Sequence, residues 1–333
     1  MKQRVLGKTG LLVPEIGFGG IPIQRITEQE VVSLVDALLE NGIRYIDTAR
    51  GYSVSEAYLG NALKGRREQF VLATKSMART KESMASDIET SLRNLRTDYI
   101  DLYQVHNPSV ADFAVFNGAG GAVEALMEAK AQGKIGHLGI TVHTKEAFAL
   151  ALELDWVETI MFPYNIVETQ GEDLIQRCKE KNVGFIAMKP LAGGAIDDPK
   201  TAIKFILNND AVSVVIPGMY SVSEVKENAS VESGAFTEAE KASIEQIKGR
   251  LDTAFCRRCG YCQPCPQGIN IPVLFTFHGY LKRYGLRDWA KPRYDGMQKN
   301  ASDCAGCGVC ETRCPYQLPI RKMLKEVRKD FEA

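Results

Sequence analysis

Eight short apolar segments alternate with eight amphipathic segments between Leu11 and about residue 230, and this alternation limits the possible fold more than any other feature. The apolar segments are rich in β-branched residues and end in polar residues or glycine, at residues 16–20, 43–48, 70–75, 99–106, 135–142, 159–165, 183–190 and 212–218. Continuously apolar strands joined by helices indicate a parallel sheet covered on both faces. Eight such units in roughly 220 residues predict an α/β fold, a closed (β/α)8 barrel. The glycine fingerprint of an open dinucleotide-binding sheet is missing after the first strand.

Local start and stop signals support the helices of this barrel. Thr27 and Glu30 form a capping box, apolar residues recur at helical spacing from Val31 to Leu39, and Gly42 ends the helix. The other predicted helices lie near residues 55–64, 83–95, 122–132, 144–154, 172–181, 199–208 and 221–230. Residues 4–13 predict a hairpin that turns at Lys8–Gly10 and closes the barrel floor, and residues 237–251 predict one further helix.

Eight of the nine cysteines lie in two short runs near the C-terminus, and each run is followed by proline. The first run is Cys256, Cys259, Cys262 and Cys265, and the second is Cys304, Cys307, Cys310 and Cys314. The second run has the C-x2-C-x2-C-x3-C-P spacing with which bacterial ferredoxins hold [4Fe–4S] clusters. We therefore predict two [4Fe–4S] clusters in a small helical module at residues 251–333, after a barrel at residues 1–250. Helices are predicted at 272–284 and 319–331, and the ninth cysteine, Cys178, is predicted to be a packing residue.

Disulfides and structural zinc are the alternatives for these cysteines. Only Cys178 lies outside the two runs, and no apolar signal segment follows Met1, so a disulfide scaffold is disfavoured. A run of four cysteines that ends in Cys-Pro is also unusual for zinc. In ferredoxins the fourth cysteine of a run binds the other cluster, which would pair Cys314 with the first run and Cys265 with the second. Cys265 follows Cys262 by three positions, whereas Cys314 follows Cys310 by four, so this pairing stays open.

Charge and hydropathy exclude several classes of function. The 41 Lys and Arg residues balance 41 Asp and Glu residues, so the net charge points neither to nucleic acid nor to an acidic partner. No apolar run approaches the ~20 residues that span a bilayer. We expect a cytoplasmic protein that does not bind a membrane.

Four polar residues stand at the carboxyl ends of predicted strands, where barrel enzymes place their catalytic groups. Asp47 and Tyr52 follow the second strand, Lys75 ends the third and His106 ends the fourth. The stretch 47–52 with Ser55-Glu56 and residues 59–63, and the stretch 92–95 with residues 98–102 and His106, resemble the two signatures of the aldo/keto reductase superfamily. This resemblance covers residues 1 to about 250. It implies an oxidoreductase that reduces an aldehyde or ketone with NAD(P)H, or oxidises the alcohol.

The resemblance also implies a role for each of the four residues. Tyr52 would protonate the carbonyl oxygen, Lys75 would stabilise its tyrosinate, and Asp47 would hold the lysine charged. His106 would hydrogen-bond the carbonyl oxygen. The structural alternatives are a buried Asp47–Lys75 ion pair and strand-end aromatic residues that only pack.

The nucleotide site departs from the family pattern. Thr141 stands where many members have serine, but Val142 replaces a hydrogen-bonding residue, Met161 a carboxamide-binding glutamine and Met188 a stacking aromatic. The residues that the resemblance assigns to the cofactor are Thr141, Asn165, Met188, Gly218, Glu224, Glu227 and Asn228. Gly193 and Gly194 are expected near the pyrophosphate or as loop residues, and His143 near the substrate or on the surface.

The residues at the adenine end favour one nucleotide over the other. A carboxylate at Glu224 would repel a 2′-phosphate, so we predict that NADH is preferred over NADPH, with Lys226 as a rescue for phosphate. The alternative is that Glu224 is an ordinary first-turn helix residue.

The two parts of the chain differ in how they carry electrons. A nicotinamide donates two electrons as hydride, whereas a cluster takes one at a time, so coupling them needs a flavin or similar converter. The sequence shows no flavin motif but leaves a flavin open. The clusters could transfer electrons to an electron-carrier protein, sense redox state or stabilise structure. The alternative function is an iron–sulfur protein whose barrel is only a binding scaffold.

Overall fold

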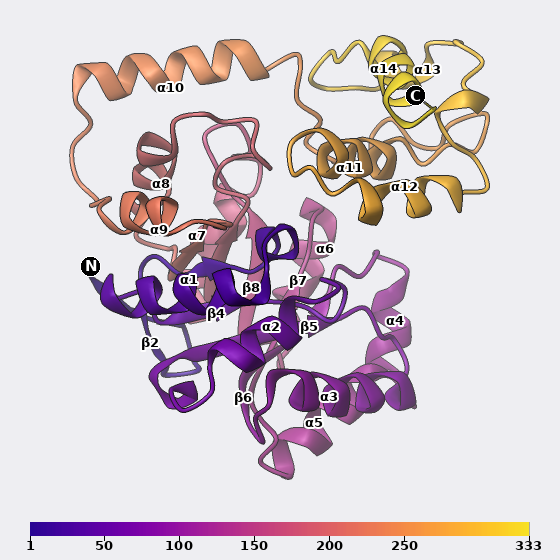
Figure 1. Cartoon of the computed structure of the whole chain (residues 1–333). Coiled ribbons are helices and arrows are strands. Elements are labelled where there is room, and N and C mark those ends of the chain that lie inside the picture. The colour runs from indigo at the N-terminus through magenta and orange to yellow at the C-terminus, as the bar shows by residue number, and fades with distance from the viewer. Residues whose placement is uncertain (333) are drawn as a thin grey trace. The chain divides into compact units, whose positions relative to one another are not determined.

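Eight parallel strands form the predicted barrel (Figure 1). The computed structural model describes residues 1–332, and its barrel strands are β3 Phe18–Gly19, β4 Tyr45–Asp47, β5 Val71–Ser76, β6 Ile100–His106, β7 Ile135–Thr141, β8 Thr159–Pro163, β9 Gly184–Met188 and β10 Val214–Ile216. They pair in sequence order from β3 to β10. Parallel bridges from Ile16 to Val215 and from Gly19 to Gly218 join the first strand to the last, so the sheet nearly closes on itself.

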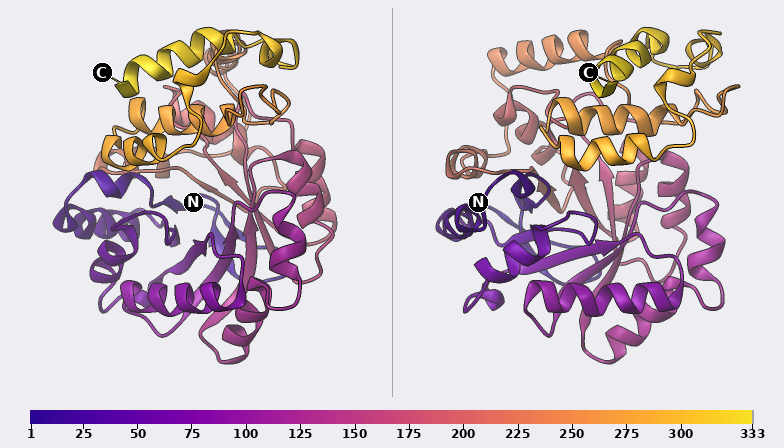
Figure 2. Two further views of the ribbon diagram at one scale, coloured as in Figure 1. Left: turned by 90° about the vertical axis from the view of Figure 1, so that its right-hand side faces the viewer. Right: turned by 45° about the vertical axis from the view of Figure 1, so that its right-hand side comes forward.

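Helices surround these strands, as Figure 2 shows from two directions. They are α1 Glu28–Glu40, α2 Ser55–Ala62, α3 Lys81–Leu95, α4 Asp112–Asn117, α5 Ala122–Ala131, α6 Lys145–Ala151, α7 Glu172–Glu180, α8 Pro199–Leu207 and α9 Val222–Ala229, with 3-10 turns at Pro22–Arg25 and Arg67–Gln69. The capping box of α1 is confirmed, because the Thr27 N–H donates to Glu30 Oε2 (2.7 Å) and the Glu30 N–H donates to Thr27 Oγ1 (3.3 Å). Of these nine α-helices, only the short α4 was not predicted.

The N-terminal hairpin is also confirmed. β1 Gln3–Val5 pairs antiparallel with β2 Leu12–Pro14, and Leu6 and Val13 are buried with Tyr45 and other strand residues in one apolar cluster. Gly7 bridges to Val183 beside the start of β9, at a φ of +54°. A Cβ at Gly7 would lie 2.1 Å from the Gly184 nitrogen, so only glycine allows this approach. The hairpin therefore closes the amino-terminal end of the barrel.

The chain divides into two compact units. The first unit comprises residues 1–165, 169–190 and 199–235 and contains the barrel strands. The second unit comprises residues 166–168, 191–198 and 236–332 of the described chain, so it includes two short segments that follow β8 and β9 in sequence.

Helices dominate the second unit. They are α10 Glu238–Leu251, α11 Ile271–Lys282, α12 Arg287–Asp295, α13 Val309–Thr312 and α14 Ile320–Glu332, with a 3-10 turn at Ala301–Asp303. Its apolar core includes Leu274, Leu324 and the stacked rings of Tyr294 and Phe331, whose centroids lie 4.2 Å apart. Within residues 1–332, no helix is both long and apolar enough to cross a membrane.

Candidate active site and cysteine sites

A buried ion pair lies at the carboxyl ends of β4 and β5. Lys75 Nζ contacts Asp47 Oδ1 and donates to the Thr48 carbonyl oxygen (2.8 Å), and the two paired side chains are 1% and 3% exposed. Gln104 Nε2 on β6 donates to the other carboxylate oxygen of Asp47 (3.1 Å). Burial raises the pKa of Asp47 and lowers the pKa of Lys75, and each partner opposes the effect of burial on the other.

Tyr52 and His106 lie next to this pair. Lys75 Nζ is 4.9 Å from the centroid of the Tyr52 ring. The rings of Tyr52 and His106 meet edge to face, with centroids 6.1 Å apart and an interplanar angle of 88°. The structure thus brings together the four side chains that the sequence motifs single out.

His106 has the environment of a neutral imidazole. Burial, followed by the charges of Lys75, Arg79 and Lys189, lowers the pKa of His106 well below its usual range. Its Nδ1 atom is buried and has no hydrogen-bond partner within residues 1–332. Arg79 Nη2 donates to the His106 carbonyl oxygen (3.0 Å), which holds the end of β6 in place. A neutral ring can donate one N–H to a carbonyl oxygen.

The residues expected at the nicotinamide are mostly buried strand ends. The Thr141 hydroxyl donates to Gln104 Oε1 (3.3 Å) and lies 3.8 Å from the sulfur of Met161, so it faces the barrel interior. Asn165 Nδ2 donates to the Lys189 carbonyl oxygen (2.9 Å), and Met188 ends β9 with 8% of its surface exposed. Gln104, which joins Thr141 to Asp47, was missed from the sequence, although it lies two residues before His106 on the same strand face.

The residues expected at the adenine gather around the start of α9. Glu224 closes the capping box of this helix, since its Oε2 accepts from the backbone N–H groups of Tyr220 (2.8 Å) and Ser221 (3.3 Å). This contact fits the alternative of an ordinary first-turn helix residue. Asn228 is buried and Glu227 is exposed. A cation that the motifs did not indicate also lies here, because the Arg25 guanidinium is 4.3 Å from the centroid of the Tyr220 ring.

Four other residues singled out from the sequence lie in the positions described next. Cys178 is fully buried on α7, as expected for a packing residue. His143 Nδ1 lies 2.8 Å from Asn107 Oδ1. Gly193 and Gly194 have φ angles of +66° and +81°, and the Gly193 carbonyl oxygen accepts a hydrogen bond from Arg283 Nε (2.7 Å) within the second unit.

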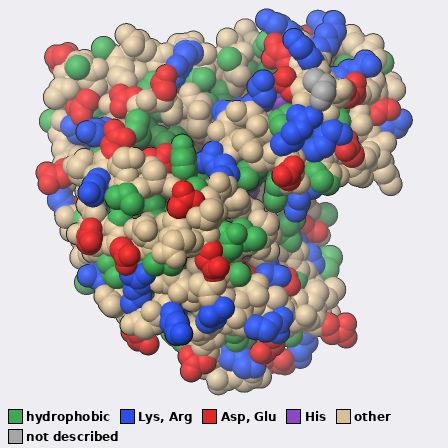
Figure 3. Space-filling view, viewed as in Figure 1, with side chains coloured by type: hydrophobic (Ala, Val, Ile, Leu, Met, Phe, Trp, Pro, Cys, Tyr) green, Lys and Arg blue, Asp and Glu red, His purple; other side chains and the backbone are tan. Residues whose placement is uncertain are grey.

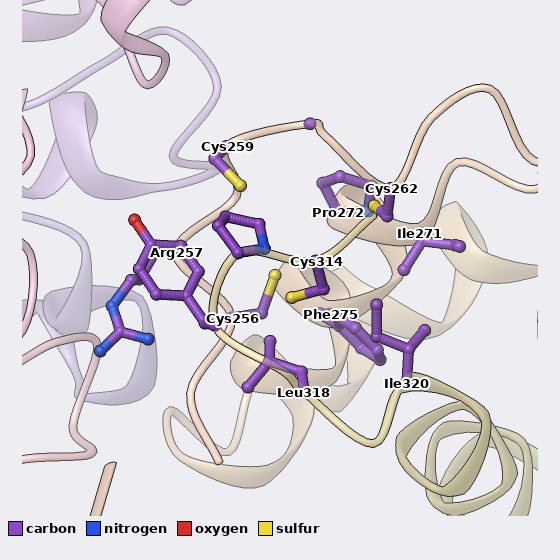
Figure 4. A pocket seen from close by; sticks show the side chains of 13 residues that line it. Cys256, Arg257, Cys259, Cys262, Ile271, Pro272, Phe275, Cys314, Leu318 and Ile320 are labelled. Atoms are coloured by element: carbon purple, nitrogen blue, oxygen red, sulfur yellow. The ribbon is translucent and has the colours of Figure 1, made fainter. Parts of the chain in front are cut away.

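Four cysteines of the second unit line one pocket, shown in Figure 4. Three of them come from the first run and the fourth, Cys314, comes from the second run. Apart from Arg257 and the cysteines, its walls are mainly apolar residues such as Phe275 and Ile320. This is the set of thiols that the ferredoxin-type exchange pairs together.

The spacing of the thiols bears on the zinc alternative. Four sulfurs around one zinc ion, each about 2.3 Å from the metal, would lie close to one another. Within residues 1–332, no three Cys, His, Asp or Glu side chains are grouped so as to hold a single ion. Four thiolates can hold either a zinc ion or an iron–sulfur cluster, so the cysteine set alone fits both.

The second set of cysteines lies on a more open loop. Cys310 is buried on α13, whereas Cys307 is exposed. Arg313 donates to the Pro264 carbonyl oxygen (3.0 Å), so the end of the second run meets the end of the first, beside Cys265.

Two arginines, Arg257, which is buried, and Arg258, which is partly exposed, stand between the first two cysteines. Arg257 lines the pocket, donates to the Val167 carbonyl oxygen (2.8 Å) and lies 3.9 Å from the centroid of the Tyr316 ring. Arg258 pairs with the fully buried carboxylate of Glu168. The adjacent arginines are visible in the sequence, but the buried carboxylate partner of Arg258, 90 residues away, is not.

Comparison with known proteins agrees with both parts of this geometry. Residues 15–202 match the model of the aldo/keto reductase family, and residues 255–319 match that of a 4Fe-4S dicluster domain. Since the first match covers more than half of the chain, the chain belongs to the aldo/keto reductase family of oxidoreductases, and it carries a C-terminal 4Fe-4S dicluster domain.

Particular relatives support this assignment. L-galactose dehydrogenase from Arabidopsis thaliana is 28% identical over 298 residues, which cover 74% of this chain and 91% of that protein. 6-dehydroglucose reductase from Novosphingobium aromaticivorans is 28% identical over 227 residues, which cover 60% of this chain and 72% of that protein. The holo structure of aldo-keto reductase AKR11C1 from Bacillus halodurans has a TM-score of 0.65 and 29% identity, and the match covers 74% of this chain and 96% of that chain.

Proposed function

We propose that this chain interconverts a small aldehyde or ketone with its alcohol, using a nicotinamide nucleotide and the side chains of Asp47, Tyr52, Lys75 and His106. The observation that carries the proposal is the contact of one buried ammonium, Lys75, with both Asp47 and the Tyr52 ring, beside the unpartnered imidazole nitrogen of His106. One relative is named a dehydrogenase and another a reductase, which supports chemistry in either direction.

In this mechanism the nucleotide supplies the hydride when it is bound, and the protein manages the proton. Tyr52 gives its phenolic proton to the carbonyl oxygen as negative charge develops there. Lys75 stabilises the tyrosinate that remains, and Asp47 with Gln104 holds the ammonium in place. Neutral His106 donates an N–H to the same oxygen and so orients the substrate.

The test is replacement of Tyr52 by Phe, which keeps the ring and removes only the phenolic hydroxyl group. We expect carbonyl turnover to fall by roughly 10²- to 10⁴-fold, with nucleotide binding retained. Nucleotide fluorescence measures binding on the same samples. Turnover equal to that of the wild type would remove Tyr52 as the acid.

We further propose that NADH is preferred over NADPH. A partly exposed carboxylate at Glu224 disfavours a 2′-phosphate even while it caps α9. Steady-state rates with each nucleotide, on the same protein sample, test this preference. A higher kcat/KM for NADPH would overturn it, and Arg25, beside Tyr220, would then be the first cation to replace.

For the C-terminal domain we propose two [4Fe–4S] clusters that pass electrons one at a time to or from a carrier protein. The cysteine pocket supports the first cluster, and the exposed loop around Cys307 supports an electron path to the outside. Anaerobic protein should be mixed with NADH or NADPH without substrate, and the visible cluster absorbance followed. Bleaching would indicate that a converter such as a flavin joins the two chemistries. No bleaching would mean that the barrel and the clusters work separately.

A second candidate function rests on the buried, apolar residues Val142 and Met161, which offer no hydrogen bond to a carboxamide. In that case the barrel would be a binding scaffold and the iron–sulfur domain the active part. If the protein bound neither NADH nor NADPH, this function would be favoured over the first.

A further inference from the structure

The neutral charge of the whole chain conceals two opposite imbalances. Residues 256–332 contain 14 Lys or Arg residues and seven Asp or Glu residues, whereas the preceding 255 residues contain 27 and 34. Before any cluster is bound, the cysteine-containing part therefore carries seven excess positive charges, and the remainder carries seven excess negative charges. In Figure 3, Lys and Arg side chains are prominent over the elements that Figure 1 labels α11, α12 and α14.

The last helix of the chain concentrates part of this charge on one face. Ile320, Leu324, Val327 and Phe331 of α14 are buried in the core of the second unit. Lys322, Lys325 and Lys329 follow one another at spacings of three and four residues, so they line the opposite face of the helix. All three lysines are exposed, and none has a hydrogen bond or ion pair within residues 1–332.

This lysine face begins beside the exposed cysteine loop. Arg321, which precedes Lys322, donates from its backbone N–H and from Nε to the carboxylate of Glu311, both at 2.8 Å. Its Nη1 also reaches the Gly306 carbonyl oxygen (3.5 Å), next to Cys307. The first turn of α14 is thus fixed against the loop that carries the one exposed cysteine of the two runs.

We propose that the surface formed by Lys322, Lys325, Lys329 and the loop at Cys307 docks an acidic protein that carries single electrons. The inference rests on the electron-transfer role proposed above for the clusters. Unpaired cations attract an acidic partner and orient it during encounter, and their position beside an exposed cluster ligand brings the two redox centres close. In the transfer the reduced carrier loses one electron, one cluster gains it, and no proton or bond is exchanged. The lysines would also attract nucleic acid, but nucleic acid does not exchange electrons with a cluster, so the exposed cysteine loop favours an electron carrier.

The test is electron transfer from a reduced acidic ferredoxin, as probe, to the oxidised whole chain with its clusters intact. Stopped-flow absorbance should show a second-order rate that falls as salt is added, because the Debye length shrinks to about 10 Å at 0.1 M. The variant Lys322→Glu/Lys325→Glu should react roughly 10- to 100-fold more slowly at low salt and lose most of the salt dependence. The matched control Lys64→Glu/Lys200→Glu changes the same charge at two exposed lysines of the first unit and should react like the wild type. Iron content and the EPR spectrum verify that both variants keep their clusters.

The outcomes separate this proposal from the function on which it rests. Equal rates in the Lys322/Lys325 variant and the control, with normal reduction by ferredoxin, would overturn the docking surface and leave the electron-transfer role intact. Failure of both ferredoxin and reduced methyl viologen to reduce the clusters would overturn the electron-transfer role itself. A fluorescent RNA oligonucleotide that binds the wild type but not the variant, with unchanged ferredoxin kinetics, would identify nucleic acid as the partner and overturn the proposal.

Discussion

Replacing Lys75 by Met would remove the positive charge beside Tyr52. The ammonium lies 4.9 Å from the centroid of the Tyr52 ring. At an effective dielectric constant of about 20, a unit charge at this distance stabilises developing tyrosinate by about 3 kcal/mol. A loss of that size corresponds to a fall in kcat of roughly 10²-fold.

The same substitution would also unbalance the buried ion pair. Asp47 would lose its buried cationic partner, which costs about 3–5 kcal/mol of folding free energy. The double variant Asp47→Asn/Lys75→Met removes both charges and leaves Gln104 an amide partner. We expect the double variant to recover most of the lost stability and none of the lost rate, because the rate depends on the ammonium.

Two measurements on the same samples decide between charge and folding. Rapid-mixing fluorescence of the nucleotide gives the rate of hydride transfer to 4-nitrobenzaldehyde as a test carbonyl, and urea unfolding gives the stability. A Lys75→Met rate within about three-fold of the wild type would refute the electrostatic role. Recovery of rate together with stability in the double variant would show that the loss came from folding.

Two further predictions concern the cysteines and the histidine. Cys314→Ala should remove one cluster and about half of the iron, because the Cys314 thiol lines the pocket of the first run. Iron analysis and EPR measure this loss. An unchanged iron content would contradict the assignment of Cys314 to the cluster of the first run. For His106, the folded-state pKa lies below the unfolded value, so as pH falls below ~6.5 only the unfolded chain binds a proton and stability is lost, by at most about 1.4 kcal/mol per pH unit. His106→Gln should reduce this acid-side loss in urea unfolding compared at about pH 7.5 and 5.5, and parallel losses in both proteins would argue against it.

The barrel could be predicted because its signals are local and repeated. Each barrel strand is a short apolar run, and each predicted barrel helix has apolar residues at helical spacing. The predicted and observed elements therefore differ mainly at their ends. For example, a strand was predicted at residues 16–20, and only Phe18 and Gly19 are paired in β3. The missed helices lack such signals. α4 has six residues, and α12 contains Pro292, a residue that argues against a helix. Burial of Tyr294 against Phe331 holds α12 in the second unit, and that contact is not visible in the sequence around α12.

The site divides in the same way. Strand ends meet at one edge of a barrel, so the proximity of Asp47, Tyr52, Lys75 and His106 followed from topology. The contacts of Glu224 could not be predicted in this way. A carboxylate in the first turn of a helix can bind a ribose or cap the helix, and only the geometry distinguishes these two roles. The basic surface was hidden for another reason, since a charge summed over the whole chain cancels two opposite parts.

The second unit is discontinuous in sequence, and this affects how such a protein could have evolved. Its members include Val167 and Glu168 after β8 and the segment 191–198 after β9, which Arg257, Arg258 and Arg283 bind. A cluster module gained as an exchangeable cassette would need none of these bonds. Cutting the chain before Cys256 would leave the Glu168 carboxylate without its arginine. We therefore expect related chains to gain or lose Glu168 and Arg258 together.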